Sequence, residues 1–512
     1  MKNRSHLTII LLIVLSILIQ IYSICPPVLS DQLQYYGSAA SFPQFPVNPS
    51  HWSLRIGLIL PVALIYRVFG YSEISYYFIP VLSLILLTLV VFKFGEKLFS
   101  YRIGIISALW FMTLPGVLKE SGNLLPDIPA TLCIASGFLV LQKIYSKNLL
   151  AEQSTDRIIP NFRFLLVLAG MLFGWAYLTK EYFLIFLFLV PVCFFAFSIP
   201  WKYFLNFMIG FFLIISIELF FGIIIYHDPF IRLFTSQPRE TWGEIERNSK
   251  VILAYLPRLF LNEGNLPSLA LMIFFTIGSL IRIIKRDFKF LFLFAWALLI
   301  FGFYTGLGLL PIVLNWGNKV VLRAHIFRYW IPILPPIIIG GIAVIDSAVS
   351  SILHKLNITV QTKKIIKHVF LPGLLSISIA SGFIKTVNFP DFVRNGNDHY
   401  LELRDFLSKL EKPLYSIWIL RDIRVGYDDM LPIYTHDFWG KEIWQGKIKY
   451  LNNDDNYMHL EEIPNGYILI DREYYHLQYN RIPDYLDTPP ENWQIAFESE
   501  NKKIALYLAM KN

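Results

Sequence analysis

The sequence has few charged residues, few cysteines and no internal repeat. Only 16% of its 512 residues are charged, whereas 55% are hydrophobic and 16% aromatic. The mean hydropathy of +0.51 is higher than a soluble core requires, which predicts a polytopic α-helical membrane protein. The three cysteines, Cys25, Cys133 and Cys193, lie in or beside apolar stretches, so no disulfide framework can be inferred. The missing repeat weighs against a secondary transporter built from two inverted halves.

Eleven apolar windows are long enough to cross about 30 Å of hydrocarbon. We expect crossings near residues 7–25, 74–95, 103–118, 128–145, 164–180, 182–200, 203–226, 267–284, 288–307, 326–346 and 368–387. A shorter window at 53–69 contains Arg55, Pro61 and Arg67, which make it a poor simple span. We expect this segment to lie in the interface or to re-enter the membrane.

Basic residues are concentrated in short loops between these windows. The net charge of +8 therefore indicates membrane topology through the positive-inside rule, and not nucleic-acid binding. With residues 53–69 in the interface, every basic loop falls on the cytoplasmic side, together with the N-terminus. The first apolar run follows Lys2 and Arg4 without a small-residue cleavage site, so we expect an uncleaved first helix. The expected location is the plasma or inner membrane.

The chain divides by composition near residue 388. Residues 1–387 form the expected transmembrane domain, with outer loops at 26–73 and 227–266. Residues 388–512 lack apolar runs and are numerous enough to hold their own core, which predicts a soluble extracytoplasmic α/β domain. In it we expect a helix near 399–411, strands near 414–420, 447–451 and 466–471, and a hairpin near 493–509.

Two isolated acids stand at expected membrane boundaries on the outer face. Asp31 follows the first apolar window, and Asp127 lies between Pro126 and Pro129. A carboxylate at a bilayer edge is costly to keep, so both are candidates for chemistry. The alternative for each is helix capping at a solvated membrane edge.

Several short motifs, taken in order, carry a resemblance to a known family. They are Asp31 with Tyr35-Tyr36, Leu54-Arg55-Ile56-Gly57, Phe69-Gly70-Tyr71-Ser72-Glu73, Lys97-Leu98-Phe99-Ser100-Tyr101-Arg102, Leu125-Pro126-Asp127-Ile128-Pro129, Gly174-Trp175-Ala176-Tyr177-Leu178-Thr179-Lys180-Glu181 and Arg328-Tyr329-Trp330-Ile331-Pro332-Ile333-Leu334-Pro335. Over most of residues 1–345 the chain resembles the C-type (GT-C) polyprenyl-phosphate-sugar-dependent glycosyltransferases. It resembles in particular the branch that includes protein O-mannosyltransferases and lipid A aminoarabinose transferases.

This resemblance implies sugar transfer from a polyprenyl-phosphate donor to a lipid, glycan or protein acceptor on the outer face. It implies Asp31 as the base of an inverting displacement and Asp127 as a second acid that orients the acceptor or Asp31. The family often has Asp-Glu in the first outer loop, where this chain has Asp31-Gln32. If the first outer loop supplies the base, we expect Asp31 to act without an adjacent acid.

Cations and aromatic residues on the expected outer face are candidates for substrate binding. A leaving lipid phosphate needs fixed positive charge, and Arg55, Lys180 and Arg328 map to that face, as do Lys319 and Arg323. Snorkelling to lipid headgroups is their alternative role. Tyr35 and Tyr36 suit stacking on sugar or isoprenoid, although an interfacial aromatic belt explains them equally.

Other functions are compatible with the same residues. Some members of this superfamily use a divalent cation, for which Asp31, Asp127 and His51 are the candidate ligands. A transporter or flippase of a lipid-linked substrate is the main alternative, and it predicts charges near the bilayer midplane. A non-catalytic membrane subunit that presents the C-terminal domain to a partner is the third.

Overall fold

The structure is a computed structural model of the whole chain. It describes residues 2–23, 26–44, 46, 49–151, 162–235, 260–261, 265–313, 327–356, 358–388, 398–410, 415–420, 424–444, 448–451, 465–472, 489 and 493–510. Cys25, Lys319, Arg323 and most of the 227–266 loop lie outside the described residues.

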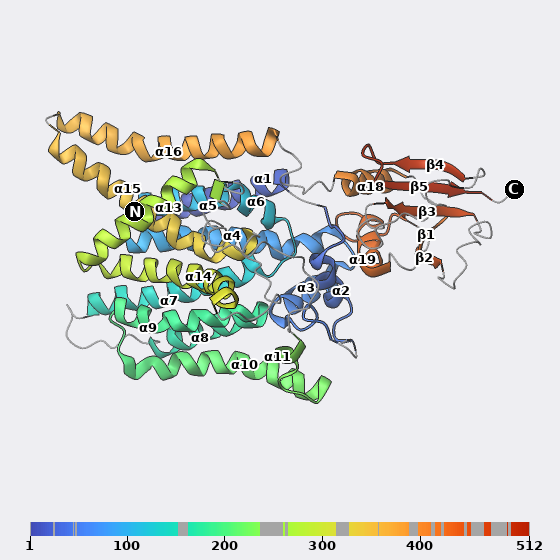
Figure 1. Cartoon of the computed structure of the whole chain (residues 1–512), viewed down its shortest axis with the longest axis horizontal. Coiled ribbons are helices and arrows are strands. Elements are labelled where there is room, and N and C mark those ends of the chain that lie inside the picture. Colours follow the sequence, from blue (N-terminus) through green and yellow to red (C-terminus); the bar gives the residue numbers. More distant parts are fainter. Residues whose placement is uncertain are drawn as a thin grey trace.

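A long helical bundle forms one part of the molecule, and a small sheet with two helices forms the other (Figure 1). The longer bundle helices are α1 (Lys2–Ser23), α4 (Glu73–Leu98), α5 (Tyr101–Met112), α7 (Asp127–Ala151), α8 (Phe162–Thr179), α10 (Phe204–Tyr226), α13 (Leu266–Ile284), α14 (Phe288–Val313), α15 (Leu334–Lys355) and α16 (Val360–Asn388). Shorter ones are α6 (Pro115–Ser121), η1 (Glu181–Phe188), α9 (Leu189–Ala196), η2 (Trp201–Tyr203), α11 (Ile231–Thr235) and η4 (Phe327–Ile333).

The described residues contain eight helices long and apolar enough to cross a membrane. A ninth is counted when α5 and α6, which meet at a 63° bend, form one span. Shorter apolar helices occupy Ser5–Ile21, Ile56–Phe69 and Glu181–Ala196. Each of the expected crossings coincides with one of these helices, and the predicted polytopic fold is confirmed.

Two short helices lie at the end of the bundle that faces the sheet (Figure 1). They are α2 (Asp31–Ala40) and α3 (Ile56–Phe69), and they pack against each other. The 14 residues of α3 extend over about 21 Å, which is shorter than the hydrocarbon of a bilayer. This length fits the interfacial segment expected at 53–69.

The C-terminal sheet has the strand order β2-β1-β3-β5-β4. Its elements are α18 (Asp398–Lys409), β1 (Ser416–Leu420), α19 (Arg424–Tyr434), β2 (Ile448–Leu451), β3 (Gly466–Asp471), β4 (Trp493–Glu498) and β5 (Ile504–Ala509). The strand β1 runs parallel to β2 and β3, whereas β5 is antiparallel to β3 and β4. The predicted α/β character is confirmed, with α19 as an additional helix.

The sheet and its helices are packed directly onto the end of the bundle. The Tyr434 hydroxyl donates to the Pro27 carbonyl at 2.5 Å, and Arg404 pairs with Glu73 at 3.3 Å. One hydrophobic cluster includes buried side chains of α2, α3 and α4 together with side chains of α19 and the strands. The short helix α2 is therefore held between the bundle and α19.

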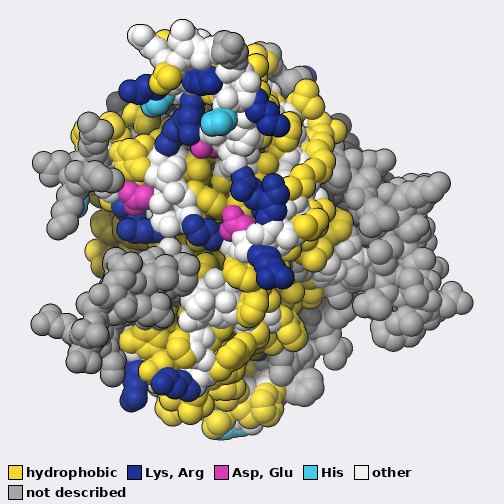
Figure 2. Space-filling model, turned by 90° about the vertical axis from the view of Figure 1, so that its left-hand side faces the viewer, with side chains coloured by type: hydrophobic (Ala, Val, Ile, Leu, Met, Phe, Trp, Pro, Cys, Tyr) yellow, Lys and Arg dark blue, Asp and Glu magenta, His cyan; other side chains and the backbone are white. Residues whose placement is uncertain are grey.

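The end of the bundle that faces away from the sheet carries many cationic side chains. Figure 2 shows Lys and Arg side chains gathered over this end, with few Asp or Glu among them. Contacts join its loops, because the Lys289 amine donates to the Leu98 carbonyl at 2.9 Å and Arg102 donates to the Lys367 carbonyl. Short loops with several Lys and Arg side chains are the pattern that the positive-inside rule describes for one side of a membrane.

Helices α8 and α10 cross at two glycines, so a larger side chain at this crossing should destabilise the protein. A Cβ on Gly170 would lie 1.9 Å from the Phe207 carbonyl oxygen, and one on Gly210 would lie 1.9 Å from the Val167 carbonyl oxygen. Small residues let helix backbones approach closely in membranes. We expect Gly170→Val to destabilise the purified protein by about 1–3 kcal/mol, measured by thermal unfolding in detergent.

Gly302 is the matched control, because a Cβ there meets no atom within 4 Å. Gly302→Val should leave the unfolding temperature close to that of the parent chain. Equal unfolding temperatures for the two valine variants would contradict the close crossing of α8 and α10.

Candidate active site

Asp31 and Arg328 meet at the end of the bundle next to the sheet. Asp31 begins α2, where a negative charge is favoured by the helix dipole, and Arg328 lies in η4. The Arg328 Nη2 atom donates to the Asp31 Oδ2 atom at 3.0 Å. The Asp31 side chain is 32% exposed and the Arg328 side chain 17% exposed. This pair is reachable from outside the protein.

Asp127 and Lys180 form a second ion pair, which is closed. The Lys180 Nζ atom lies 2.5 Å from the Asp127 Oδ1 atom, and the Tyr182 hydroxyl donates to the same oxygen at 3.0 Å. The side chains of Asp127 and Lys180 are 2% and 4% exposed. The Asp127 Oδ2 atom is buried without a hydrogen-bond partner among the described residues. The carboxylate therefore binds side chains of another segment and does not cap α7.

A third charged group links four segments of the bundle. The Arg55 guanidinium donates to both oxygens of Glu181, at 2.8 and 3.3 Å. Arg232 donates to Glu181 at 3.1 Å and to Glu218 at 3.2 Å. Arg55 precedes α3, Glu181 begins η1, Arg232 lies in α11 and Glu218 in α10. These contacts fix the positions of the segments around the site.

The neighbouring residues Lys180 and Glu181 serve different ion pairs. Lys180 has an extended backbone (φ −155°, ψ 119°) between α8 and η1. Successive side chains of extended backbone project to opposite sides. Lys180 consequently reaches Asp127, and Glu181 reaches Arg55 and Arg232. A pairing between the two neighbours themselves, which their sequence suggests, does not form.

Tyr35 lies inside the charged group. Arg55 donates to its hydroxyl, and the Arg55 guanidinium carbon is 5.6 Å from its ring centroid. Burial raises the pKa of Tyr35 well above its usual value, Arg55 opposes this rise, and the carboxylates of Asp31, Glu181 and Asp127 add to it. The hydroxyl therefore stays protonated, and the two candidate acids lie in one electrostatic neighbourhood.

Tyr36 is placed differently from Tyr35. It is fully buried, its hydroxyl lies 2.5 Å from the Ser75 hydroxyl, and its ring packs against Tyr66, Tyr71 and Tyr76. The arrangement favours a packing role for Tyr36. His51 lies with its ring 4.0 Å from that of Trp52. Within the described part of the chain, no group of three or more His, Cys, Asp or Glu side chains has the arrangement of a metal site.

The sequence motifs pointed to most of the cations near Asp31 and Asp127, but not to several of the side chains that contact these cations. Tyr329 lies with its ring centroid 4.3 Å from the Lys180 amine and 5.4 Å from the Arg328 guanidinium carbon. Tyr182 and Arg232 were also missed. Arg232 was detectable, because an isolated cation just after an apolar window on the expected outer side departs from the positive-inside rule.

The ion pairs differ in the exposure of their cations, since Arg328 is partly exposed whereas Lys180 and Arg55 are buried. Asp31 and Arg328 present an acid and a planar cation side by side, which suits proton acceptance next to phosphate binding. Asp127 and Lys180 pair with each other in the interior, and the buried Arg55 pairs with Glu181, whose side chain is 30% exposed. Arg328 also interacts electrostatically with Asp127 and Glu120, so the open pair lies within the field of the closed ones.

The backbone is similar to two crystal structures of ArnT from Cupriavidus metallidurans. The match to the structure with undecaprenyl phosphate has a TM-score of 0.60 at 13% identity, over 98% of this chain and 99% of ArnT. The match to the apo structure has the same TM-score and identity and covers 100% of both chains. An archaeal oligosaccharyltransferase, AglB from Archaeoglobus fulgidus with an inhibitory peptide and a dolichol-phosphate, matches at a TM-score of 0.48 and 13% identity, over 87% of this chain and 65% of AglB.

The two ArnT comparisons show the fold. The chain has the C-type (GT-C) glycosyltransferase fold of a multi-pass membrane protein, as its sequence motifs predicted. No protein-family model and no curated protein sequence matches the chain.

The closed pair of Asp127 and Lys180 generates a stability prediction. Replacing Lys180 by Met leaves the Asp127 carboxylate buried without its cation, so we expect a loss of about 3–5 kcal/mol in thermal or denaturant unfolding. The double variant Lys180→Met with Asp127→Asn removes both charges and should recover most of this loss.

Lys93→Met is the control for this experiment. Lys93 pairs with Glu96 at 2.9 Å, and its side chain is 31% exposed, so its removal should cost no more than about 1 kcal/mol. A double variant as unstable as Lys180→Met alone would contradict the pairing of Lys180 with Asp127.

Proposed function

We propose that this chain is a membrane glycosyltransferase that moves a hexose or pentose from a polyprenyl-phosphate donor to a lipid, glycan or protein acceptor. The observation that carries this proposal is the reachable contact between Asp31 and Arg328. The GT-C fold supports it, because one of the matched ArnT structures holds undecaprenyl phosphate. The gathering of charged pairs at one end of the bundle favours this reaction over a transporter or flippase, which needs charges near the midplane.

The reaction takes place on the extracytoplasmic face in this proposal. The Lys and Arg side chains of Figure 2 then face the cytoplasm together with the N-terminus. The transmembrane domain of residues 1–387 carries the charged site, and the domain of residues 388–512 packs beside it through contacts of α19 with α2. The membrane is the plasma or inner membrane of the cell.

Asp31 accepts the proton of the acceptor in the proposed step. As the acceptor oxygen or nitrogen bonds to the anomeric carbon from the face opposite the phosphate, the bond from that carbon to the phosphate oxygen breaks. The acceptor proton passes to the Asp31 carboxylate, and the electron pair leaves on the lipid phosphate. Such a displacement inverts the anomeric configuration, and general base catalysis of this kind contributes about 10²–10⁴-fold to the rate.

Arg328 binds the departing phosphate in this scheme. Its Nε atom is buried without a hydrogen-bond partner among the described residues, and its Nη2 atom holds Asp31. A phosphate on this guanidinium competes with Asp31 for the same donors, which frees the carboxylate to accept a proton. Donor binding and activation of the base are thereby coupled. Arg55 and Lys180, held in closed pairs, act as positioning residues.

The variant Asp31→Asn tests the proposed base. It keeps the shape of the side chain and removes its basicity, so we expect transfer to fall by about 10²-fold or more with normal expression and unfolding temperature. The measurement is product formation by purified protein incubated with a panel of polyprenyl-phosphate sugars and saccharide, lipid and peptide acceptors.

Asp228→Asn provides the matched control, because Asp228 is an outer acid that caps the backbone amide of Phe230 at 2.8 Å. It should transfer sugar at the parental rate. Full transfer by Asp31→Asn would overturn the assignment of the base. Movement of the labelled donor across a vesicle membrane without its consumption would favour a flippase.

The variant Arg328→Ala tests the phosphate-binding role. Charge-assisted hydrogen bonds contribute about 1.5–3 kcal/mol, so we expect the Kd of the chain for undecaprenyl phosphate to rise about 10- to 100-fold. Arg328→Lys should recover part of the affinity as a point charge without the planar fork. Arg472→Ala, in the sheet domain, is the control with unchanged affinity. An unaltered Kd in Arg328→Ala would exclude Arg328 as the phosphate ligand.

A further inference from the structure

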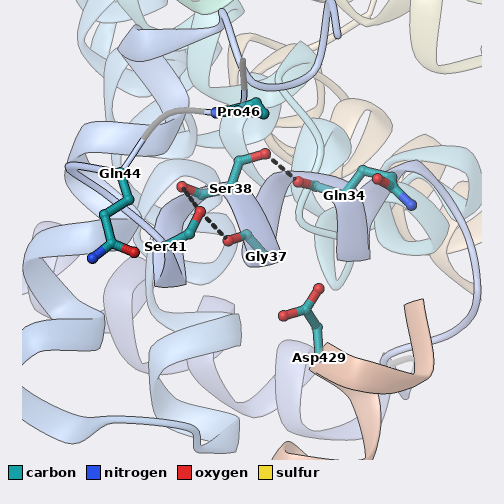
Figure 3. Close-up of a pocket in the computed structure, with 7 residues that line it drawn as sticks. All are labelled: Gln34, Gly37, Ser38, Ser41, Gln44, Pro46 and Asp429. Atoms are coloured by element: carbon teal, nitrogen blue, oxygen red, sulfur yellow. Dashed lines mark hydrogen bonds between the residues drawn. The ribbon is translucent and has the colours of Figure 1, made fainter. Parts of the chain in front are cut away.

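A polar cavity lies between α2 and α19, on the side of α2 that faces away from the bundle core. Its volume is about 350 Å³, and the residues around it are Gln34, Gly37, Ser38, Ser41, Gln44, Pro46 and Asp429 (Figure 3). None of these residues belongs to the charged site. The volume falls at the lower end of the range for small-ligand pockets, roughly 300–1,000 Å³.

The cavity shares one face of α2 with Asp31. The opposite face of this helix is buried and consists of Gln32, Leu33, Tyr35, Tyr36 and Ala39. Asp31, Gln34, Ser38 and Ser41 follow one another at intervals of three or four residues, which places them in one stripe along the helix. Ser38 lies about 10 Å along the helix axis from Asp31. A polar path therefore leads from the cavity to the candidate base.

Gly37 lets a carboxylate of the sheet domain approach α2. A Cβ at this position would lie 2.1 Å from the Asp429 Oδ2 atom. Glycine in a helix interior costs about 0.5–1 kcal/mol relative to alanine, so the close approach is maintained against helical propensity. Ser38 and Ser41 donate their hydroxyl protons to the carbonyls of Gln34 and Gly37, at 2.7 and 2.9 Å. Their oxygens remain available as acceptors.

Asp429 is an acid without a cation. Among the described residues it has no ion pair, and its one hydrogen bond is a long one of 3.4 Å from the Tyr71 hydroxyl. Burial raises the pKa of Asp429 to about 7, the neighbouring Asp428 adds to the rise, and Tyr71 opposes it. A ligand that donates hydrogen bonds to this carboxylate would stabilise it, whereas a phosphate would be repelled.

We propose that this cavity binds a saccharide unit of the acceptor and presents its hydroxyl to Asp31 along the polar face of α2. The inference rests on the proposed glycosyltransferase function and names the acceptor class. The two glutamine amides can donate and accept, and the serine oxygens and the carboxylate can accept, which suits the hydroxyls of a neutral sugar because each of these both donates and accepts. The lipid phosphate binds at Arg328, so donor and acceptor approach Asp31 from different directions.

Binding of methyl glycosides to the full-length protein tests this proposal. The probes are the methyl glycosides of glucose, mannose, galactose and N-acetylglucosamine, observed by saturation-transfer NMR on protein in phospholipid nanodiscs free of sugar detergents. We expect at least one to bind, and its affinity to fall about tenfold or more in Ser38→Leu, which fills the cavity, and in Asp429→Asn, which removes the acceptor charge.

Controls separate this site from the charged site and from misfolding. Ser216→Leu makes the same change on the exposed face of α10 and should bind the glycoside as the parent does. Affinity for undecaprenyl phosphate should stay within about twofold in Ser38→Leu and Asp429→Asn. Asp429→Asn is nearly isosteric, so it remains informative if Ser38→Leu fails to fold.

The outcomes distinguish failure of this proposal from failure of the proposed function. No binding by any glycoside, or binding unchanged in both cavity variants, overturns the cavity assignment even if the chain consumes a polyprenyl-phosphate sugar. Cavity-dependent glycoside binding by a chain that consumes no donor supports a saccharide site and overturns the glycosyltransferase function.

Discussion

The end of the bundle next to the sheet depends on the rule that a buried charge must have a partner. Asp127 and Lys180 lie 2.5 Å apart and are almost completely buried. Taking a single ion out of water costs several kcal/mol, so neither residue is tolerable there alone. Arg55 and Arg232 obey the same rule through Glu181. The closed pairs connect segments that are far apart in sequence, and they hold α3, α7, α11 and η1 in a defined arrangement.

The ion pair of Asp31 and Arg328 differs from these buried pairs in how easily a ligand can replace one of its partners. A partly exposed ion pair contributes little to stability, and water or a ligand can replace either partner. Beside it, the buried charges of Asp127, Lys180, Arg55 and Arg232 are each engaged with an opposite charge. A charged substrate would therefore interact first with Arg328 and Asp31. The electrostatic field of the neighbouring ion pairs would change little. Such a preorganised environment is what stabilises developing charge in a transition state.

Much of the fold follows from hydrophobic patterning, because every backbone group inside a membrane must bond within its own helix. The apolar windows were predictable for this reason, and Asp31, Asp127, Arg55, Lys180 and Arg328 were recognisable as isolated charges at their ends. The strands of the C-terminal sheet were predictable from their own residue pattern. The partners were not predictable. Lys180 and Glu181 are neighbours in sequence, and only the extended backbone at Lys180 sends them to different partners. Contacts of this kind are tertiary, so no local pattern encodes them.

The C-terminal domain contributes to the site by stabilising the helix that carries Asp31. The helix α2 carries Asp31 yet has only 10 residues, and isolated helices shorter than about 12–15 residues are marginal in water. Its stability must come from packing, which α3 supplies on one side and α19 on another. The hydrophobic cluster that buries Tyr35 and Tyr36 is completed by Tyr427 and Met430 of α19. Without the sheet domain, the helix that carries Asp31 would lose the packing of α19, so the domain is part of the scaffold that positions the candidate base.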